Sequence, residues 1–219
     1  MIIVAVTDIH GSPERLSAIA DDLHAADVVL LTGDLTHFGH REEAERVLQA
    51  ARSHADRLFA IAGNCDHGDV EDYMVEQGVD LHGRCRVVDG VAFIGLGGSL
   101  PCPFRTPNER TEGRMQALLR AAAREAEPGL PLVLVSHQPP LNTAVDVAHG
   151  GRHVGSTSVR RFIEEYQPLG CFTGHIHEGR GVDSIGPTQI VNPGPLRAGG
   201  YAYAEIDSGG VRLELRGVR

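Results

Sequence analysis

Seven polar side chains stand at or just beyond the ends of short apolar runs in the sequence. Carboxylate, amide and imidazole groups of this kind are ligands for divalent metal ions. The set holds two carboxylates, four imidazoles and one amide, which is more than one ion needs. It therefore predicts two adjacent metal ions that share a ligand. The seven residues are Asp8, His10, Asp34, Asn64, His137, His175 and His177.

Each motif can be explained either as a metal site or as an ordinary structural feature. Asp8 and His10 are two residues apart, so in an extended chain both point to one side. Asp34 carries two oxygens and could bridge two cations, whereas a lone Asp at this position could equally form a turn. The pair His175-Ile176-His177 is the strongest single motif, because two imidazoles at this spacing are hard to explain as packing. Asn64 could simply close an Asx turn, and a lone His137 could be structural.

Strands and helices alternate in the first half of the chain, which is typical of a mostly parallel sheet. A helix is expected to begin near Ser12-Pro13-Glu14, with Ser12 as its cap. The carboxyl ends of parallel strands meet at one sheet edge, which would bring the polar residues together. The expected strands are 2–7, 28–32 and 58–62, and the expected helices that follow include 41–53 and 69–77.

The second half has shorter runs broken by glycine and proline. Asp89-Gly90 indicates a hairpin, and residues 99–110 and 141–156 read as loops in which substrate specificity would lie. The further expected elements are strands 132–136, 180–185, 188–192, 201–206 and 211–216 and helices 111–126 and 156–166. The fold class is therefore α/β (α+β), with two packed sheets and helices on the outer faces. We expect one domain spanning 1–219.

Composition narrows the classes of function. The net charge of −9 argues against strong nucleic-acid binding, and no stretch approaches the roughly 20 apolar residues of a membrane span. The N-terminus lacks the pattern of a signal peptide, so a cytoplasmic location is expected. Cys65, Cys85, Cys102 and Cys171 are scattered, without the spacing of a zinc or disulfide framework. The oligomeric state stays open, and a homo-oligomer is possible.

The order of motifs D-x-H, G-D, G-N-x-D, S-H-x-P-P and G-H-x-H, across residues 8 to 177, resembles the calcineurin-like metallophosphoesterase superfamily. The resemblance implies a two-sheet β-sandwich flanked by helices. It also implies that one metal is held by Asp8, His10, Asp34 and His177. The second would be held by Asp34, Asn64, His137 and His175, with Asp34 bridging. Mn²⁺ is the first choice, and Fe, Zn, Co or Ni are alternatives.

One position departs from the family pattern. Many members have histidine where this chain has Cys65, and that histidine is thought to assist the leaving group. A thiol is a weak hydrogen-bond donor, and His67 could substitute for it. The GNCD version is similar to a subset of members related to the phosphodiesterases, so diesters or esters with good leaving groups are favoured. The resemblance assigns catalytic roles to Asp34, Asn64, Cys65, Asp66 and His137.

The sequence thus predicts a metal-dependent phosphoesterase that acts on a small phosphate ester, more specifically a phosphodiester. A dinuclear metal-activated hydroxide would attack the phosphorus in line. Three alternatives stay open: a non-catalytic scaffold that keeps the fold, a phosphomonoesterase and a phosphoprotein phosphatase. The helix start near Ser156 could also bind an anion of the substrate, although a simple N-cap explains it equally well.

Overall fold

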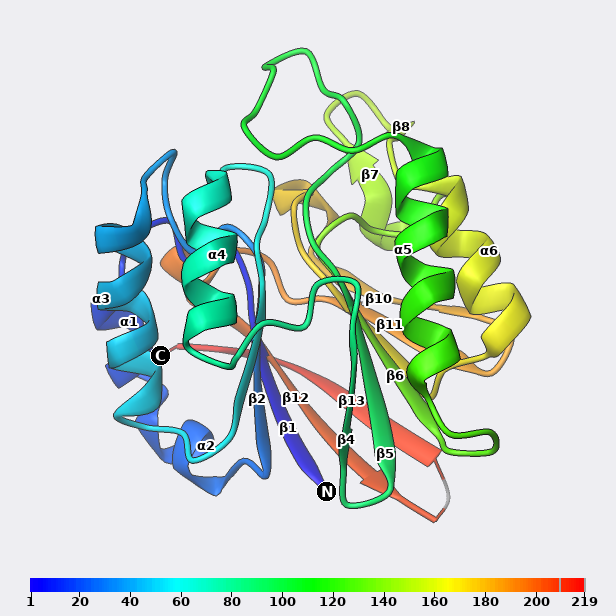
Figure 1. Ribbon diagram of the computed structural model, residues 1–219, viewed down its shortest axis with the longest axis horizontal. Helices are drawn as coiled ribbons and strands as arrows, with labels where there is room; N and C mark the ends of the chain where they lie inside the picture. Colours follow the sequence, from blue (N-terminus) through cyan, green and yellow to red (C-terminus); the bar gives the residue numbers. More distant parts are fainter. Residues whose placement is uncertain (209, 219) are drawn as a thin grey trace.

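The computed structural model describes residues 1–208 and 210–218 and has two β-sheets packed face to face, with helices on both outer faces (Figure 1). This arrangement confirms the predicted architecture. Figure 1 shows helices α1 to α4 on one side of the strands, and α5 and α6 on the other. The long loop 99–110 rises above the ends of the strands.

The first sheet has five strands in the order β13-β12-β1-β2-β3. Strands β1, β2 and β3 are parallel, and the helices between them provide the crossovers. Their sequences are continuous runs of Val, Ile and Leu because both faces of the sheet are covered. The strands are β1 (Ile2–Val6), β2 (Val28–Thr32), β3 (Leu58–Ile61), β12 (Gly200–Asp207) and β13 (Gly210–Gly217).

The second sheet has six strands in the order β10-β11-β9-β6-β5-β4. The predicted hairpin joins β4 to β5, and Asp89 and Gly90 have φ angles of 47° and 81°. A separate pair, β7 (Val147–Ala148) and β8 (Arg152–His153), forms within the predicted loop 141–156. The six strands are β4 (Cys85–Val88), β5 (Val91–Leu96), β6 (Leu132–Ser136), β9 (Gly170–Thr173), β10 (Gly181–Ile185) and β11 (Thr188–Asn192).

The helices largely match the predicted ranges. The first helix begins at Glu14, within the predicted start, but Pro13 stands at its N-cap position and no side chain caps it, so the predicted cap by Ser12 is wrong. The short α2 was not predicted. The helices are α1 (Glu14–Ser17), α2 (Ala20–Ala25), α3 (Arg41–Arg52), α4 (Gly68–Glu76), α5 (Glu112–Glu125) and α6 (Thr157–Tyr166), with 3₁₀ turns η1 (Ala144–Asp146), η2 (His177–Gly179) and η3 (Leu196–Ala198).

Alternation along β1 shows how the core is layered. Val4 and Val6 pack under the helices, whereas Ile3 and Ala5 pack between the sheets against the second sheet. Phe93 of the second sheet belongs to the layer between the sheets and is fully buried. Removing such a ring typically costs about 3–5 kcal/mol. The tightly packed layers therefore fix the strand ends relative to one another.

The loops that follow the strands of both sheets meet at one edge. The amide of Asp8 donates to the carbonyl of Gly33 over 3.0 Å, which ties the loop after β1 to the loop after β2. Across the second sheet, the amide of Gly174 donates to the carbonyl of His137 over 3.2 Å. The amide of His175 in turn donates to Asp8 Oδ2 over 3.2 Å, which joins the loops of the two sheets at the predicted ligands.

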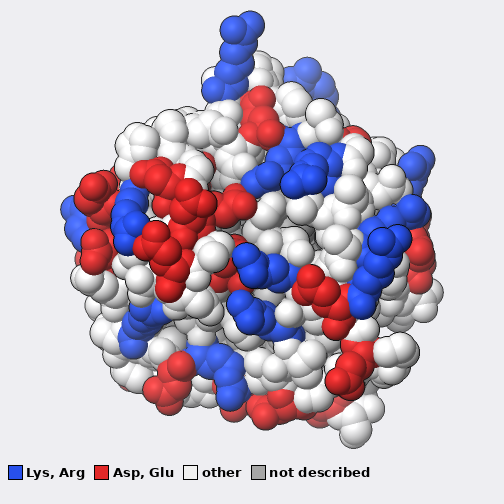
Figure 2. Space-filling view, viewed as in Figure 1, with Lys and Arg blue, Asp and Glu red and all other residues white. Residues whose placement is uncertain are grey.

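Acidic and basic side chains share the face seen in Figure 2, with acidic groups gathered over α3 and α4. In residues 1–208 and 210–218, no helix is long and apolar enough to cross a lipid bilayer. The four cysteines, all of them described, carry free thiols.

Candidate metal centre

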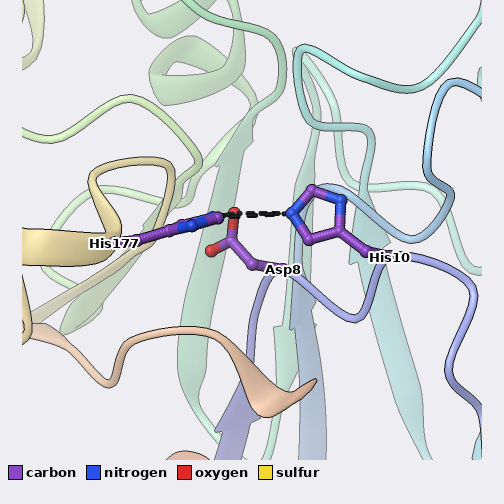
Figure 3. A group of neighbouring side chains, drawn as sticks. All are labelled: Asp8, His10 and His177. Carbon is purple, nitrogen blue, oxygen red and sulfur yellow. Dashed lines mark hydrogen bonds and ion pairs between the residues drawn. The ribbon is translucent and has the colours of Figure 1, made fainter. Parts of the chain in front are cut away.

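Asp8, His10 and His177 form the first group of converging side chains (Figure 3). His177 Nε2 lies 3.1 Å from Asp8 Oδ1, and His10 Nε2 lies 3.8 Å from the same oxygen. The two imidazole Nε2 atoms are 3.5 Å apart. Asp8 is almost fully buried, so its carboxylate needs charge compensation from these neighbours.

Asp34 stands between this first group and a second one. Its Oδ2 lies 3.8 Å from His10 Nε2, while its Oδ1 lies 3.5 Å from His137 Nε2. Its side chain is 3% exposed. The two oxygens of one carboxylate therefore face two different imidazoles, which is the arrangement that a bridging ligand requires.

His137 and Asn64 meet on the far side of Asp34. His137 Nε2 lies 3.0 Å from Asn64 Oδ1. The other ring nitrogen, Nδ1, is 2.9 Å from the carbonyl of Thr32 and donates its hydrogen there, which directs Nε2 into the cluster. The ring of His175 lies 5.2 Å from that of His137, and His175 lines a cavity together with His10, Asp34 and Asn64. Candidate ligand atoms of the described residues converge in three groups, to none of which His175 belongs: Asp8, His10 and His177; His10, Asp34 and Cys65; and Asp8, Asp34 and His137.

The backbone at these positions is unusual. Asp8, His10, Asp34 and His175 have φ angles of 52°, 49°, 49° and 68°, in the left-handed region that few non-glycine residues adopt. Such strain persists where the surrounding structure holds it, and it is concentrated at functional sites. Gly63 explains part of the close packing, because a Cβ atom there would collide with the backbone and side chain of Asp34.

Burial and charge set the protonation of the cluster. Burial alone would raise the pKa of Asp34, but the neighbouring His137 lowers it below the ordinary value. Burial opposes charge on His137 as well, yet the Asp34 carboxylate raises the pKa of His137 to about 9. Burial lowers the pKa of His175 to about 4. These shifts favour the ionised form of Asp34 and the protonated form of His137 in the protein without metal.

The donor set fits divalent cations. Carboxylate, amide and imidazole donors suit Mn²⁺, Fe²⁺, Zn²⁺, Co²⁺ and Ni²⁺. The candidate ligand atoms in each of the three groups lie within 4.8 Å of one another. The carboxylates of Asp8 and Asp34 are both buried, and two such charges close together are costly to bury. Cations in place of the His137 proton would neutralise both.

Cys65, Asp66 and His67 have three different surroundings. Cys65 faces the cavity and groups with His10 and Asp34, and burial followed by the charge of Asp34 raises the pKa of its thiol. Asp66 is fully buried behind the cluster and accepts hydrogen bonds from the amides of Gly63 and Thr36. His67 stacks on His40 at 4.3 Å and does not line the cavity.

Two buried polar residues that sequence reasoning missed support the site. The Asn192 amide donates to the carbonyls of Gly174 and Ile176, which holds the loop of His175 and His177. Gln138 joins the two predicted specificity loops: it accepts from Leu100 N and donates to the carbonyl of Val154. A lone amide side chain after a strand carries no signal in sequence that would distinguish these roles.

The N-terminus of α6 is closed to substrate. The Glu112 carboxylate accepts hydrogen bonds from the amides of Thr157 and Ser158 and from the Ser156 hydroxyl. Ser156 itself caps the helix by accepting from the amides of Ser158 and Val159. The alternative in which this helix start binds an anion of the substrate is therefore wrong, because an anion of the protein already occupies it.

Comparisons with known proteins agree with this geometry. Residues 1–179 match the family model described as calcineurin-like phosphoesterase. An uncharacterised protein of Methanocaldococcus jannaschii is 36% identical over 199 residues, covering 89% of this chain and 88% of the relative. A UPF0046 protein of Caenorhabditis elegans is 27% identical, covering 90% of this chain and 70% of that one.

Solved structures share the fold at lower identity. A Thermus thermophilus protein has a TM-score of 0.71 at 20% identity, covering 100% of this chain and 99% of its own. A dimetal phosphatase from Danio rerio has a TM-score of 0.64 at 13% identity, with 100% and 96% covered. At these identities the likeness shows the fold alone.

Proposed function

Because this chain belongs to the calcineurin-like phosphoesterase family, we propose that it hydrolyses phosphate esters with a pair of divalent cations, and that it prefers phosphodiesters. The observation that carries the proposal is Asp34, whose two carboxylate oxygens face the separate imidazoles of His10 and His137. When bound, the two cations would neutralise the phosphoryl oxygens and lower the pKa of a water molecule towards neutrality.

The seven predicted ligands are proposed to divide as the family pattern implies. Asp34 would belong to both ions. Its neighbours on one side are Asp8, His10 and His177, and on the other Asn64, His137 and His175. The bond from His137 to the carbonyl of Thr32 fixes the ring so that Nε2 stays directed at the cluster. Mn²⁺ is the proposed metal, with Fe, Zn, Co or Ni as alternatives.

The preference for diesters and good leaving groups is supported by Cys65. Its thiol faces the cavity, and burial and the nearby Asp34 charge raise its pKa. A general acid works best when its pKa is near the operating pH. This thiol stays protonated, but its raised pKa makes it too weak an acid to protonate a departing alkoxide. The leaving group must therefore depart as a stable anion.

A substrate panel tests the proposal. Bis-p-nitrophenyl phosphate, p-nitrophenyl phosphate, cyclic nucleotides and a nucleic-acid model diester would be assayed with manganese-loaded protein and with protein stripped by a chelator. We expect the highest kcat/KM for diesters and a loss of about 1000-fold or more on stripping, restored by manganese. A protein that binds no metal and turns over no ester would instead support the scaffold alternative.

The substitution Cys65→His tests the role of the third motif. An imidazole titrates near neutrality, so it can donate the proton that the thiol withholds. We expect kcat for a poorly leaving alkyl ester to rise about tenfold relative to kcat for a p-nitrophenyl ester.

The matched control for this substitution is Cys102→His, which places an imidazole on another cysteine of the same cavity. The ratio of the two rates should stay at the wild-type value in that variant. An unchanged ratio in Cys65→His would mean that position 65 does not reach the leaving group.

A further inference from the structure

A cavity of about 760 Å³ opens above the candidate ligands. Its volume lies within the range of sites that enclose small organic ligands, which is roughly 300–1,000 Å³. His10, Asp34 and Asn64 contribute to its lining, and a phosphoryl group alone would fill only a small part of it. The remaining volume must take the rest of the substrate, so its lining reports on what that part is.

Much of that lining is apolar. Loop 99–110 contributes Leu100, Pro101, Pro103 and Phe104, and Phe38 comes from the loop after β2 of the other sheet. The Phe104 residue is 85% exposed and Phe38 is 48% exposed. Large exposed apolar side chains that gather at one place on a protein mark a contact with a ligand or partner.

The other large exposed apolar residues of the described chain do not share this location. Val75, Val87 and Val182 are absent from the cavity lining. The two phenylalanines are thus exposed phenyl rings that line the same cavity, although they belong to loops of different sheets. Two rings offer a surface on which another flat ring can stack.

Loop 99–110 holds Phe104 in place. One oxygen of Glu109 accepts hydrogen bonds from the amides of Cys102 and Thr106, over 3.2 and 2.8 Å. The amide of Asn108 donates to the carbonyl of Asn64 over 3.1 Å, which ties the loop to a candidate metal ligand. The loop that carries the ring is therefore anchored to the floor of the cavity.

Phe38 is held by a strained turn. Its φ angle is 58°, which is unfavourable for a bulky side chain. The turn is closed by hydrogen bonds from His37 N to Glu43 and from Gly39 N to the Thr36 hydroxyl. The ring contacts His37 edge-on, and His37 contacts His10 in the same way. An aromatic path thus leads from a candidate ligand to the rim.

The charges in the cavity indicate which end of a substrate lies where. Arg197 lines the cavity, and within residues 1–208 and 210–218 it forms no ion pair or side-chain hydrogen bond. Its turn is fixed beside the ligands, because the amide of Leu196 donates to the carbonyl of Thr7 over 2.9 Å. Of the other charged residues in the lining, Arg152 lies on β8, within loop 141–156, and Glu178 is paired with His149 over 2.6 Å. A free guanidinium beside the ligands complements an anionic phosphoryl group.

From these observations we propose that the cavity takes a phosphate diester in which the ester group that does not leave carries a flat ring. The phosphoryl end lies at the ligands with Arg197, and the ring lies against Phe38 and Phe104. This inference rests on the proposed phosphoesterase function and adds the class of substrate. It assigns loop 99–110 to recognition of the ester group.

Two diesters that share the same leaving group test the assignment. Manganese-loaded protein would be given methyl p-nitrophenyl phosphate and phenyl p-nitrophenyl phosphate, and kcat/KM would be measured for both. We expect kcat/KM for the phenyl ester to exceed that for the methyl ester by about tenfold or more in the wild type. Stacking on an aromatic ring stabilises the bound phenyl group beyond the gain from burying its apolar surface. The ratio should fall to about threefold or less in Phe104→Ala and in Phe38→Ala.

The control variant is Val182→Ala, which shortens an exposed apolar side chain outside the cavity and should keep the wild-type ratio. The difference in intrinsic reactivity between the two esters cancels when ratios are compared between variants. A wild-type ratio near one, or a ratio that both phenylalanine variants preserve, would overturn the assignment.

Binding measurements separate this inference from the proposed function. Calorimetry of manganese-loaded protein with phenylphosphonate and methylphosphonate reports the ring preference without turnover, and a preference lost in Phe104→Ala supports the inference.

Hydrolysis without any ring preference would refute the inference and keep the function. A ring preference without hydrolysis of any ester would refute the function alone. A wild-type dimer that Phe104→Ala converts to a monomer in light scattering would assign the ring to contact between copies and overturn the inference.

Discussion

Replacing Asp34 with asparagine is expected to lower kcat/KM for bis-p-nitrophenyl phosphate by at least about 1000-fold and to reduce bound manganese from two ions per chain to one or none. Loss of one electrostatic contact to a developing charge typically costs about 100- to 1000-fold. Asp34 faces the imidazoles of both groups, so its loss would affect both ions. Asparagine tolerates the left-handed backbone at this position better than alanine does.

The matched control is Asp89→Asn. Asp89 also has a left-handed backbone, with φ at 47°, but its side chain is 71% exposed in the β4–β5 turn. That variant should keep both metal content and turnover, measured by elemental analysis and by the diesterase assay. If Asp34→Asn also turned over the diester at the wild-type rate, the bridging role would be excluded.

Much of the fold could be predicted because the strands that form it are covered on both faces. The run VVLLT at 28–32 reads as a buried strand, and β2 spans Val28–Thr32. Hairpin chemistry at Asp89-Gly90 was equally clear, because both residues adopt positive φ angles readily. The cap of α1 was predicted wrongly because Ser-Pro-Glu resembles a capped helix start, whereas in the structure Pro13 occupies the N-cap position without a side-chain bond.

The candidate site was visible in sequence for a different reason. Metal ligands must have particular side chains, so Asp8 and His177 stand out among apolar neighbours even though they lie 169 positions apart. What the sequence could not reveal is how they meet, since this depends on bonds between loops of the same sheet and between loops of the two sheets. The bond from the Asp8 amide to the carbonyl of Gly33 involves backbone atoms alone. No pattern of side chains encodes it.

Residues that shape the cavity were the hardest to foresee. Phe104 and Arg197 are ordinary residue types in loops, where exposure is the default expectation. Their meaning arises only when the loop 99–110 and the turn η3 lie around one cavity. Asp66 was singled out with Asn64 and Cys65 as part of one motif, but the motif did not reveal that Asp66 lies behind the cluster rather than in the cavity lining.

Replacing Asp66 with alanine is expected to lower the free energy of unfolding by about 3–5 kcal/mol and to weaken metal binding. Its buried carboxylate accepts from the amides of Gly63, Leu35 and Thr36 over 2.7, 3.1 and 2.8 Å. It also accepts from the Thr36 hydroxyl. Leaving several buried donors without a partner carries a cost of this size. The freed loops are those that carry Asp34 and Asn64, so the ligands would separate.

The matched variant for Asp66 is Asp146→Ala, which separates stability from metal binding. Asp146 is also fully buried and accepts from the amides of Thr143 and Gly155, but it organises loop 141–156 instead of the ligand loops. In urea unfolding the two variants should lose stability to a similar extent. In metal titration of the folded proteins, only Asp66→Ala should lose affinity. Asp66 differs from Asp146 in lying behind Asp34 and Asn64. Equal metal affinity in both variants would therefore show that Asp66 stabilises the fold without positioning these two residues.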